Sequence, residues 1–209
     1  MLKKLFIPLI IALGFSFTTQ AAVTPDSAKN LVQDLANSAI SAAKLNHDNF
    51  EKLFHKYFDS MYIGRFILGR YWKQATPAQQ KEYLKLFNKL VVTSYEKRFD
   101  EYQGEQLKIT DTNQAGRDVI VKSILMDPNK SPIHINWRVR ERSKGPRIID
   151  VVVEDISLSI TQRSEFASII QQNNNSIEAL LNALREKLHE PADQQASFMG
   201  VNHTKQSPI

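Results

Sequence analysis

The sequence predicts an α+β fold in which helices pack on one face of a curved antiparallel sheet of about four strands and enclose an apolar cavity. Three observations lead to this prediction. Apolar residues recur at helical spacing from residue 25 to about residue 102, alternate with polar residues from 106 to 156, and return to helical spacing from 164 to 189. Helices followed by a run of consecutive strands are typical of α+β domains.

The amino terminus has the three parts of a secretory signal peptide, which we place at residues 1–21. Two lysines precede a mostly apolar run over residues 5–17, and small residues suited to cleavage follow it. We expect cleavage after Ala21, with Ala22 as the alternative site. A membrane anchor is the other interpretation, but the apolar run is shorter than the about 20 residues that a spanning helix needs. The sequence therefore predicts an exported protein.

The composition is that of one globular domain, predicted at residues 22–190. Of the 209 residues, 42% are apolar and 23% are charged, which excludes a fibrous or wholly disordered chain. The absence of cysteine excludes a disulfide scaffold, a thiolate metal site and cysteine catalysis. Removal of the two leader lysines lowers the net charge from +5 to +3, so we do not expect a nucleic-acid-binding protein. From Pro191 the chain is polar and aperiodic, and residues 191–209 are predicted to be a disordered tail.

The first three helical segments precede the predicted strands. Thr24-Pro25-Asp26 combines a cap, a first-turn proline and an early acid, and an apolar stripe at helical spacing follows over residues 28–42. A second stripe, dense in aromatic residues, covers residues 50–61. A further short helix is predicted over residues 62–72.

The clearest helix start of the chain comes just before the strands, and two further helical segments follow them. The segment 76–79 has a threonine cap, a first-turn proline and a glutamine that can reach back to the cap, and it begins a helix of about seven turns that ends near Gly104. After the strands, helical spacing covers residues 164–172 and 176–189, and three asparagines separate these two stretches.

The period changes to two residues in the middle of the chain. Leu107 and Ile109 alternate with polar neighbours, and residues 119–126 are apolar on both sides for part of their length. Residues 133–140 and 149–153 alternate as half-buried strands do. Turn sequences separate successive strands, at 127–130 and 143–146. These strands therefore predict an antiparallel meander.

The sequence contains no motif that would bring reactive side chains together for catalysis or metal binding. The five histidines are far apart, and no two have the i,i+4 spacing of a helical metal site. Gly64 and Gly69 have the spacing of a phosphate-binding loop, but the required lysine does not follow them. The inward strand positions are apolar, which leaves no acid–base pair for catalysis. The sequence therefore predicts no enzyme, no cofactor and no metal site.

Two stretches of this sequence resemble the signatures of the MlaC family. The first runs from Phe58 to Gln80 and contains Leu68-Gly69-x-Tyr71-Trp72 followed by Ala75-Thr76-Pro77-x-Gln79. The second, residues 156–166, follows the last strand, and it has Gln162 where the family often has an aromatic residue. The resemblance covers about residues 25–190, in the family's order and after an export signal.

The resemblance implies a periplasmic phospholipid carrier of the Mla lipid-asymmetry system, also called the toluene-tolerance auxiliary family. Such proteins hold one phospholipid with its acyl chains between helices and sheet. They shuttle lipid between an outer-membrane lipoprotein–porin complex and an inner-membrane ABC transporter with its periplasmic lipid-binding subunit. The sequence has no heptad pattern, so a monomer is the default expectation, and the oligomeric state stays open.

Apolar face positions supply the candidates for a lipid pocket, because such pockets are mainly apolar with few polar groups. The predicted lining residues are Phe66, Tyr71, Trp72, Phe87, Val91, Tyr95, Phe99, Ile124, Trp137, Val151, Val153 and Ile156. The predicted contacts to a headgroup or partner are Arg138, Arg140 and Arg163. A solvated strand face is the other interpretation of the arginines on the third strand.

One alternative function belongs to a different class. A periplasmic chaperone or interaction module would also be exported and rich in apolar bulk, but it would present an exposed apolar groove rather than an enclosed pocket. The sequence leaves this alternative open. It also leaves open the headgroup and acyl-chain preference and the direction of net transport.

Overall fold

The computed structural model describes residues 22–45, 50–100, 104–127 and 130–199. The predicted signal peptide at 1–21 lies outside these residues. The elements before the sheet are α1 (Pro25–Leu45), α2 (Phe50–Tyr57), α3 (Ser60–Leu68), the 3₁₀ helix η1 (Gly69–Lys73) and α4 (Pro77–Asp100). The strands are β1 (Gln106–Ala115), β2 (Asp118–Met126), β3 (Ile133–Arg142), β4 (Gly145–Val153) and β5 (Ile156–Ser157). The helices after the sheet are α5 (Leu158–Gln172), α6 (Ile177–Lys187) and α7 (Ala192–Phe198).

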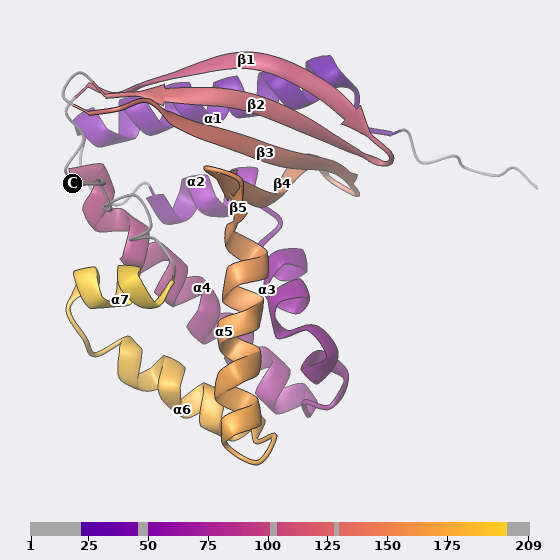
Figure 1. Ribbon diagram of the computed structural model, residues 1–209, viewed down its shortest axis with the longest axis vertical. Helices are drawn as coiled ribbons and strands as arrows, with labels where there is room; N and C mark the ends of the chain where they lie inside the picture. Colours follow the sequence, from indigo (N-terminus) through magenta and orange to yellow (C-terminus); the bar gives the residue numbers. More distant parts are fainter. Residues whose placement is uncertain (1–21, 46–49, 101–103, 128–129, 200–209) are drawn as a thin grey trace, which may run out of the picture.

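The α+β class and the antiparallel meander are confirmed. All neighbouring strands pair antiparallel in the order β1-β2-β3-β4-β5, and the sheet curves over the helices (Figure 1). The expected four strands become five, because the two residues of β5 pair with the end of β4. The last strand is too short to show a period in the sequence.

Side-chain caps explain several helix starts. The capping box predicted at the start of α4 is confirmed, since Thr76 Oγ1 accepts from the Gln79 N–H and Gln79 Oε1 accepts from the Thr76 N–H. The helix α5 begins six residues before the predicted start at Ser164. Its cap is Ser157, whose Oγ accepts from the Ile160 N–H. The earlier start follows from this cap, which a search for apolar spacing alone passes over.

The pairing register places one set of apolar side chains on a common face of the sheet. Val121 lies opposite Trp137, which lies opposite Val151, and side chains paired directly across strands point to the same face. Bulges interrupt the register between Ile109 and Asp111 in the β1–β2 pairing, and in the β3–β4 pairing at Ile149. Bulges increase the local twist, which contributes to the curvature of this sheet.

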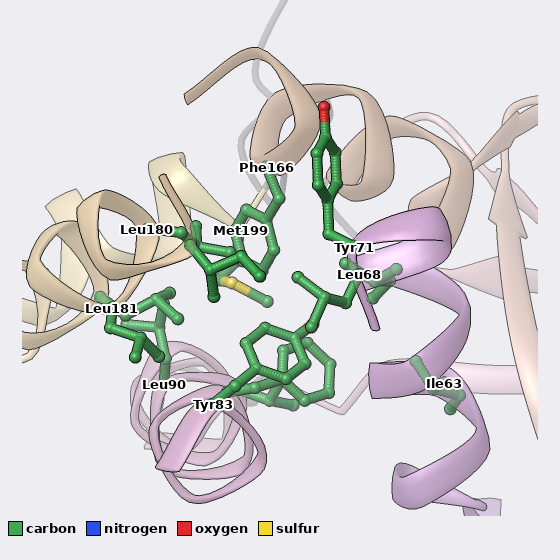
Figure 2. Close-up of a cluster of buried hydrophobic side chains, with 14 of the residues drawn as sticks. Ile63, Leu68, Tyr71, Tyr83, Leu90, Phe166, Leu180, Leu181 and Met199 are labelled. Atoms are coloured by element: carbon green, nitrogen blue, oxygen red, sulfur yellow. The ribbon is translucent and has the colours of Figure 1, made fainter. Parts of the chain in front are cut away.

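Two separate hydrophobic cores stabilise the molecule. The sheet core joins the apolar sheet face to α1 and α2, and its most buried members include Ala28, Val32, Val119, Val121, Val139 and Ile148. The helical core contains no strand residue and joins α2 to α7. Figure 2 shows its centre, where Leu68, Tyr83, Phe166 and Leu181 converge from four helices. Helices beyond α2 therefore depend mainly on one another rather than on the sheet.

The chain beyond Pro191 differs from the predicted disordered tail. Residues 192–198 form α7, which packs against α4 and α6, and Ala196 and Met199 are buried in the helical core. The side chain of Gln195 accepts from Thr93 Oγ1 and donates to the Glu190 carbonyl oxygen. Only three apolar side chains, Ala196, Phe198 and Met199, anchor this short helix among the described residues, too few to produce a visible period in the sequence. Residues 200–209 lie outside the described part of the chain.

None of the helices in the described residues is both long and apolar enough to cross a membrane. The same residues contain no group of three or more histidine and acidic side chains arranged to hold a metal ion.

Candidate functional site

The apolar sheet face is closed at one end and partly open at the other. At the closed end, Val119, Val121, Val139 and Ile148 are completely buried. Toward the other end, the apolar side chains on the same face are only half-buried. We call these side chains the apolar strip: Leu107, Ile109, Leu125, Ile133, Ile135, Trp137, Val151 and Val153. The gradient shows that the helices cover one end of this face more completely than the other.

The one polar atom among the strip's side chains has a hydrogen-bond partner. Trp137 Nε1 donates to Ser123 Oγ at 2.9 Å, and this hydroxyl donates to the Ile135 carbonyl oxygen at 2.9 Å. Ser123 is itself buried on the same sheet face. A buried indole N–H normally requires such a partner. The strip can therefore contact an apolar molecule without leaving this donor unpaired.

Aromatic side chains cluster on α2 and on α4, and part of α2 packs against the sheet core. Along α2, the ring centroids of Phe54 and Phe58 are 5.3 Å apart, and Phe50 stacks on Tyr95 of α4 at 6.0 Å. Phe58 packs against both hydrophobic cores, and Leu53 packs against the sheet core together with Trp137. We call the region between the apolar strip and these α2 and α4 side chains the seam. It lies where the two cores meet.

A backbone connection fixes the seam at one side. Phe58 forms a parallel bridge with Ile148, and the Asp59 N–H donates to the Ile148 carbonyl oxygen at 2.9 Å. The Asp59 side chain then caps α3 by accepting from the Tyr62 N–H. The junction of α2 and α3 is thus bound to the edge of β4, next to the β4 bulge.

Several predicted lining residues lie at the seam or beside it. Trp137, Val151 and Val153 belong to the apolar strip, and Tyr95 belongs to the aromatic group. Ile156 pairs with Val153 at the sheet edge, where it is exposed. The side chain of Phe99 lies outside the part of the chain whose side chains the structure describes.

Other predicted lining residues are placed elsewhere. Tyr71, Phe87 and Val91 are buried in the helical core, and Phe66 and Trp72 pack against that core. Ile124 lies opposite His134, on the sheet face away from the apolar strip. Helical spacing shows that a side chain faces away from water, but it does not distinguish a helix neighbour from a sheet neighbour. These six residues therefore do not line the seam.

The predicted arginines differ in their partners. Arg140 binds buried Asp118 through Nε and Nη2, at 2.5 and 2.8 Å, and its Nη1 donates to the Tyr62 hydroxyl. The bonds to Asp118 raise the pKa of Arg140 above its usual value. Arg138 is exposed and approaches Asp118 at 3.7 Å. Arg163 is exposed and lies over the Phe66 ring. Arg140 thus forms a partly buried ion pair with Asp118, which exposed Arg138 joins at a longer distance, whereas Arg163 faces solvent.

The prediction of lining residues missed part of the seam. Phe50, Leu53 and Phe58 belong to the aromatic-rich stripe that the sequence showed over residues 50–61. Ile133 and Ile135 alternate as inward strand residues do. The sequence therefore carried a signal for both groups of residues, but it did not show that α2 packs against the sheet core.

Comparisons with known proteins agree with this architecture. The sequence model of the family described as "MlaC protein" matches residues 26–186. The "Intermembrane phospholipid transport system binding protein MlaC" of Haemophilus influenzae is 21% identical over 206 residues, which cover 91% of this chain and 95% of that protein.

A solved structure shares the fold. The phospholipid-binding protein from Ralstonia solanacearum, in complex with a phospholipid, has a TM-score of 0.67 at 21% identity, over 83% of this chain and 97% of that chain. At this level of identity, the likeness is one of fold. The family match, in contrast, extends from the start of α1 to the end of α6, and on this ground the chain belongs to the MlaC family.

Proposed function

We propose that this protein is a periplasmic phospholipid carrier that holds the acyl chains of its cargo at the seam. The observation that carries the proposal is the apolar strip, a row of half-buried apolar side chains on a sheet face whose other end is completely buried. The names of the H. influenzae and R. solanacearum relatives support phospholipid as the cargo. The signal-like amino terminus supports export.

Burial of the acyl chains supplies the binding energy. Transfer from water contributes about 0.8 kcal/mol for each methylene, so two chains of about 15 methylenes gain on the order of 24 kcal/mol. The bilayer offers the lipid a similar gain. A carrier therefore has to match the bilayer closely if it is to load and unload, and the apolar strip offers few directional contacts that would hold one headgroup.

The cargo is moved without a chemical reaction. The apolar strip contains no ionisable side chain, so it offers the cargo no general acid or base. We propose that the protein carries lipid between an outer-membrane lipoprotein–porin complex and an inner-membrane ABC transporter with a periplasmic lipid-binding subunit. The name of the H. influenzae relative supports a place in intermembrane transport.

The first test is the lipid content of the exported protein. The chain is purified from the periplasm without detergent, extracted with organic solvent and analysed by mass spectrometry. Near-stoichiometric glycerophospholipid is expected. A protein that carries no lipid, and stays empty after incubation with liposomes, would contradict the carrier function and favour the chaperone alternative.

Two neighbouring valines localise the cargo. Val153 belongs to the apolar strip, whereas Val152 lies opposite Asn136 on the other sheet face, and both are half-buried. Val153→Lys places a charge at the seam and is expected to lower the lipid content at least tenfold, because a charged group is costly to bury beside acyl chains. Val152→Lys is the matched control and is expected to keep its lipid. Equal lipid content in the two variants would place the cargo elsewhere.

A further inference from the structure

A row of arginines stacked on aromatic rings follows the outer side of α3 and η1. Arg163 of α5 lies over Phe66, Arg65 lies over Trp72, and Arg70 lies over Tyr71, with 5.0 to 5.1 Å between guanidinium and ring centre. We call Arg65, Arg70 and Arg163 the arginine face. Figure 1 shows α3 beside α5 below the sheet.

The arginine face is exposed and is not neutralised. The three arginines are exposed, and within the described part of the chain none of them forms an ion pair with a carboxylate. Their hydrogen bonds to the protein are few. Arg70 donates to the Tyr71 hydroxyl at 3.0 Å, and Arg163 donates to the Phe66 carbonyl oxygen at 3.4 Å. Most of their N–H groups therefore remain available to an anionic partner.

Two neighbouring arginines also stack on a ring, but carboxylates neutralise them. Arg140 and Arg142 also lie over a ring, that of Tyr62, but Asp118 and Asp59 neutralise them. Both groups of arginines therefore stack on aromatic rings. Only the pair next to the sheet, at the start of α3, has carboxylate partners. The positive charge that is not neutralised lies farther along, on α3, η1 and α5.

Exposed aliphatic side chains accompany the charge. Ile160 is 58% exposed and lies one turn before Arg163 on α5, and Met61 is 52% exposed and lies one turn before Arg65 on α3. Basic residues next to exposed aliphatic ones are typical of helices that lie at a membrane surface. Protein interfaces are also enriched in arginine, methionine and aromatic residues, so residue type alone does not identify the partner. A lipid surface is favoured because it receives both features of this face: lipid phosphates bind guanidinium groups that lack a carboxylate partner, and the headgroup region accepts exposed aliphatic side chains.

We propose that the arginine face binds the surface of an anionic phospholipid bilayer, with the guanidinium groups on lipid phosphates and Ile160 and Met61 at the headgroup level. Guanidinium groups match phosphate geometry and form charge-assisted hydrogen bonds to it. Each basic residue near an anionic membrane surface contributes about fivefold in affinity, so the face supports a weak, reversible contact. Such a contact suits a protein that must leave the membrane again. It does not require lipid at the seam.

The test is sedimentation of the exported chain with sucrose-loaded vesicles. Vesicles of phosphatidylcholine alone are compared with vesicles that also contain phosphatidylglycerol. We expect binding to the anionic vesicles only, and we expect it to weaken as salt is added, because salt screens exposed charges. Binding to both kinds of vesicle alike would contradict an electrostatic contact.

Matched charge variants localise the contact. The triple variant Arg65→Gln, Arg70→Gln, Arg163→Gln keeps side chains that can cover the rings and is expected to bind about a hundredfold more weakly. The control triple variant Lys81→Gln, Lys85→Gln, Lys89→Gln removes the same charge from exposed positions of α4 and is expected to lose much less affinity. Equal losses would show a general charge effect and overturn the proposal.

Two further measurements distinguish a loss of membrane binding from a folding defect and from a loss of lipid at the seam. If the triple variant has a lowered melting temperature, the double variant Arg65→Gln, Arg70→Gln replaces it, because Arg163 also packs against Gly69. Val153→Lys should lose its lipid and still bind vesicles, which distinguishes failure at the seam from failure at the arginine face. If the natural chain did not bind anionic vesicles, the proposal would be overturned. An acidic protein would then be the better candidate partner for the arginine face.

Discussion

At Gly64 and Gly69, both in the first signature, the fold leaves little room for any residue larger than glycine. A Cβ atom on Gly64 would lie 2.8 Å from Leu84 Cδ2, so the glycine lets α3 and α4 approach closely. Gly69 ends α3 with φ 58° and ψ −128°, which a residue with a side chain rarely adopts. A Cβ there would also lie 3.0 Å from the Arg163 guanidinium. The spacing of these glycines therefore reflects helix packing and a chain reversal.

Burial of Tyr83 has a consequence at high pH. Tyr83 is completely buried, its hydroxyl donates to the Gly64 carbonyl oxygen at 3.0 Å, and burial raises the pKa of this hydroxyl well above the ordinary value of 10.0. The folded state therefore keeps the proton when the unfolded chain loses it. Tyr71 acts in the opposite direction, because the hydrogen bond from Arg70 lowers the pKa of its hydroxyl.

Tyr83→Phe is expected to reduce the alkaline loss of stability. In the natural chain, the contribution of Tyr83 is complete below pH 10 and declines as the pH rises further, because only the unfolded state then releases the proton. The variant lacks this decline, although it is about 1 kcal/mol less stable at neutral pH through the lost hydrogen bond. Urea unfolding at a series of pH values, from neutral to about pH 11, measures how steeply the free energy of unfolding falls with pH. Equal slopes in the two proteins would contradict the assignment.

At the scale of elements, α7 packs against the helical core although no apolar period in the sequence predicts it. Met199 follows α7 and is 7% exposed, and it inserts beside Phe166 and Leu180 of the helical core (Figure 2). Lys187 lies over the ring of Phe198, and Gln195 is hydrogen-bonded to α4. The helix is therefore part of the folded domain.

Met199→Ala is expected to lower the free energy of unfolding by about 2–3 kcal/mol, near the lower limit for a buried methionine because a terminal helix can readjust. Met61→Ala is the control. Met61 is 52% exposed, and its truncation should change the free energy by less than about 0.5 kcal/mol. Urea denaturation measures both variants. A Met199 variant as stable as the control would mean that α7 does not contribute to the core.

At the scale of the whole molecule, two cores meet at the seam. The buried members of the sheet core and of the helical core do not overlap, and Phe58 packs against both. Polar contacts also join the two parts, since Arg142 binds Asp59 and Arg140 donates to Tyr62. A ligand at the seam would therefore contact both cores.

Substitutions in the two cores are expected to be additive. Leu181→Ala and Val121→Ala lie in different cores, so their effects on the free energy of unfolding should sum within about 0.5 kcal/mol. Leu181→Ala and Leu90→Ala lie in the helical core near each other (Figure 2), and they should deviate from additivity by more than that. Double-mutant cycles in urea measure both sums. Strong coupling between Leu181 and Val121 would show that the cores form one unit.

The sequence by itself determined the type of most elements. The α4 cap at Thr76, the alternation around Trp137 and the turn after Arg142 depend on neighbours within a few residues, and such local rules can be applied without a structure. The same rules failed for β5 and α7, because their few apolar residues show no period. The α+β class followed from the order of the elements.

Only the tertiary structure decided which apolar residues are core and which belong to the seam. Val91 and Val151 both lie at inward positions of their elements, yet Val91 is buried among helices and Val151 lies on the apolar strip. Periodicity reports that a side chain avoids water, whereas its partners depend on contacts between residues far apart in the chain. The neutralisation of Arg140 by Asp118, and the absence of an ion pair at Arg163 among the described residues, depend on the same long-range contacts.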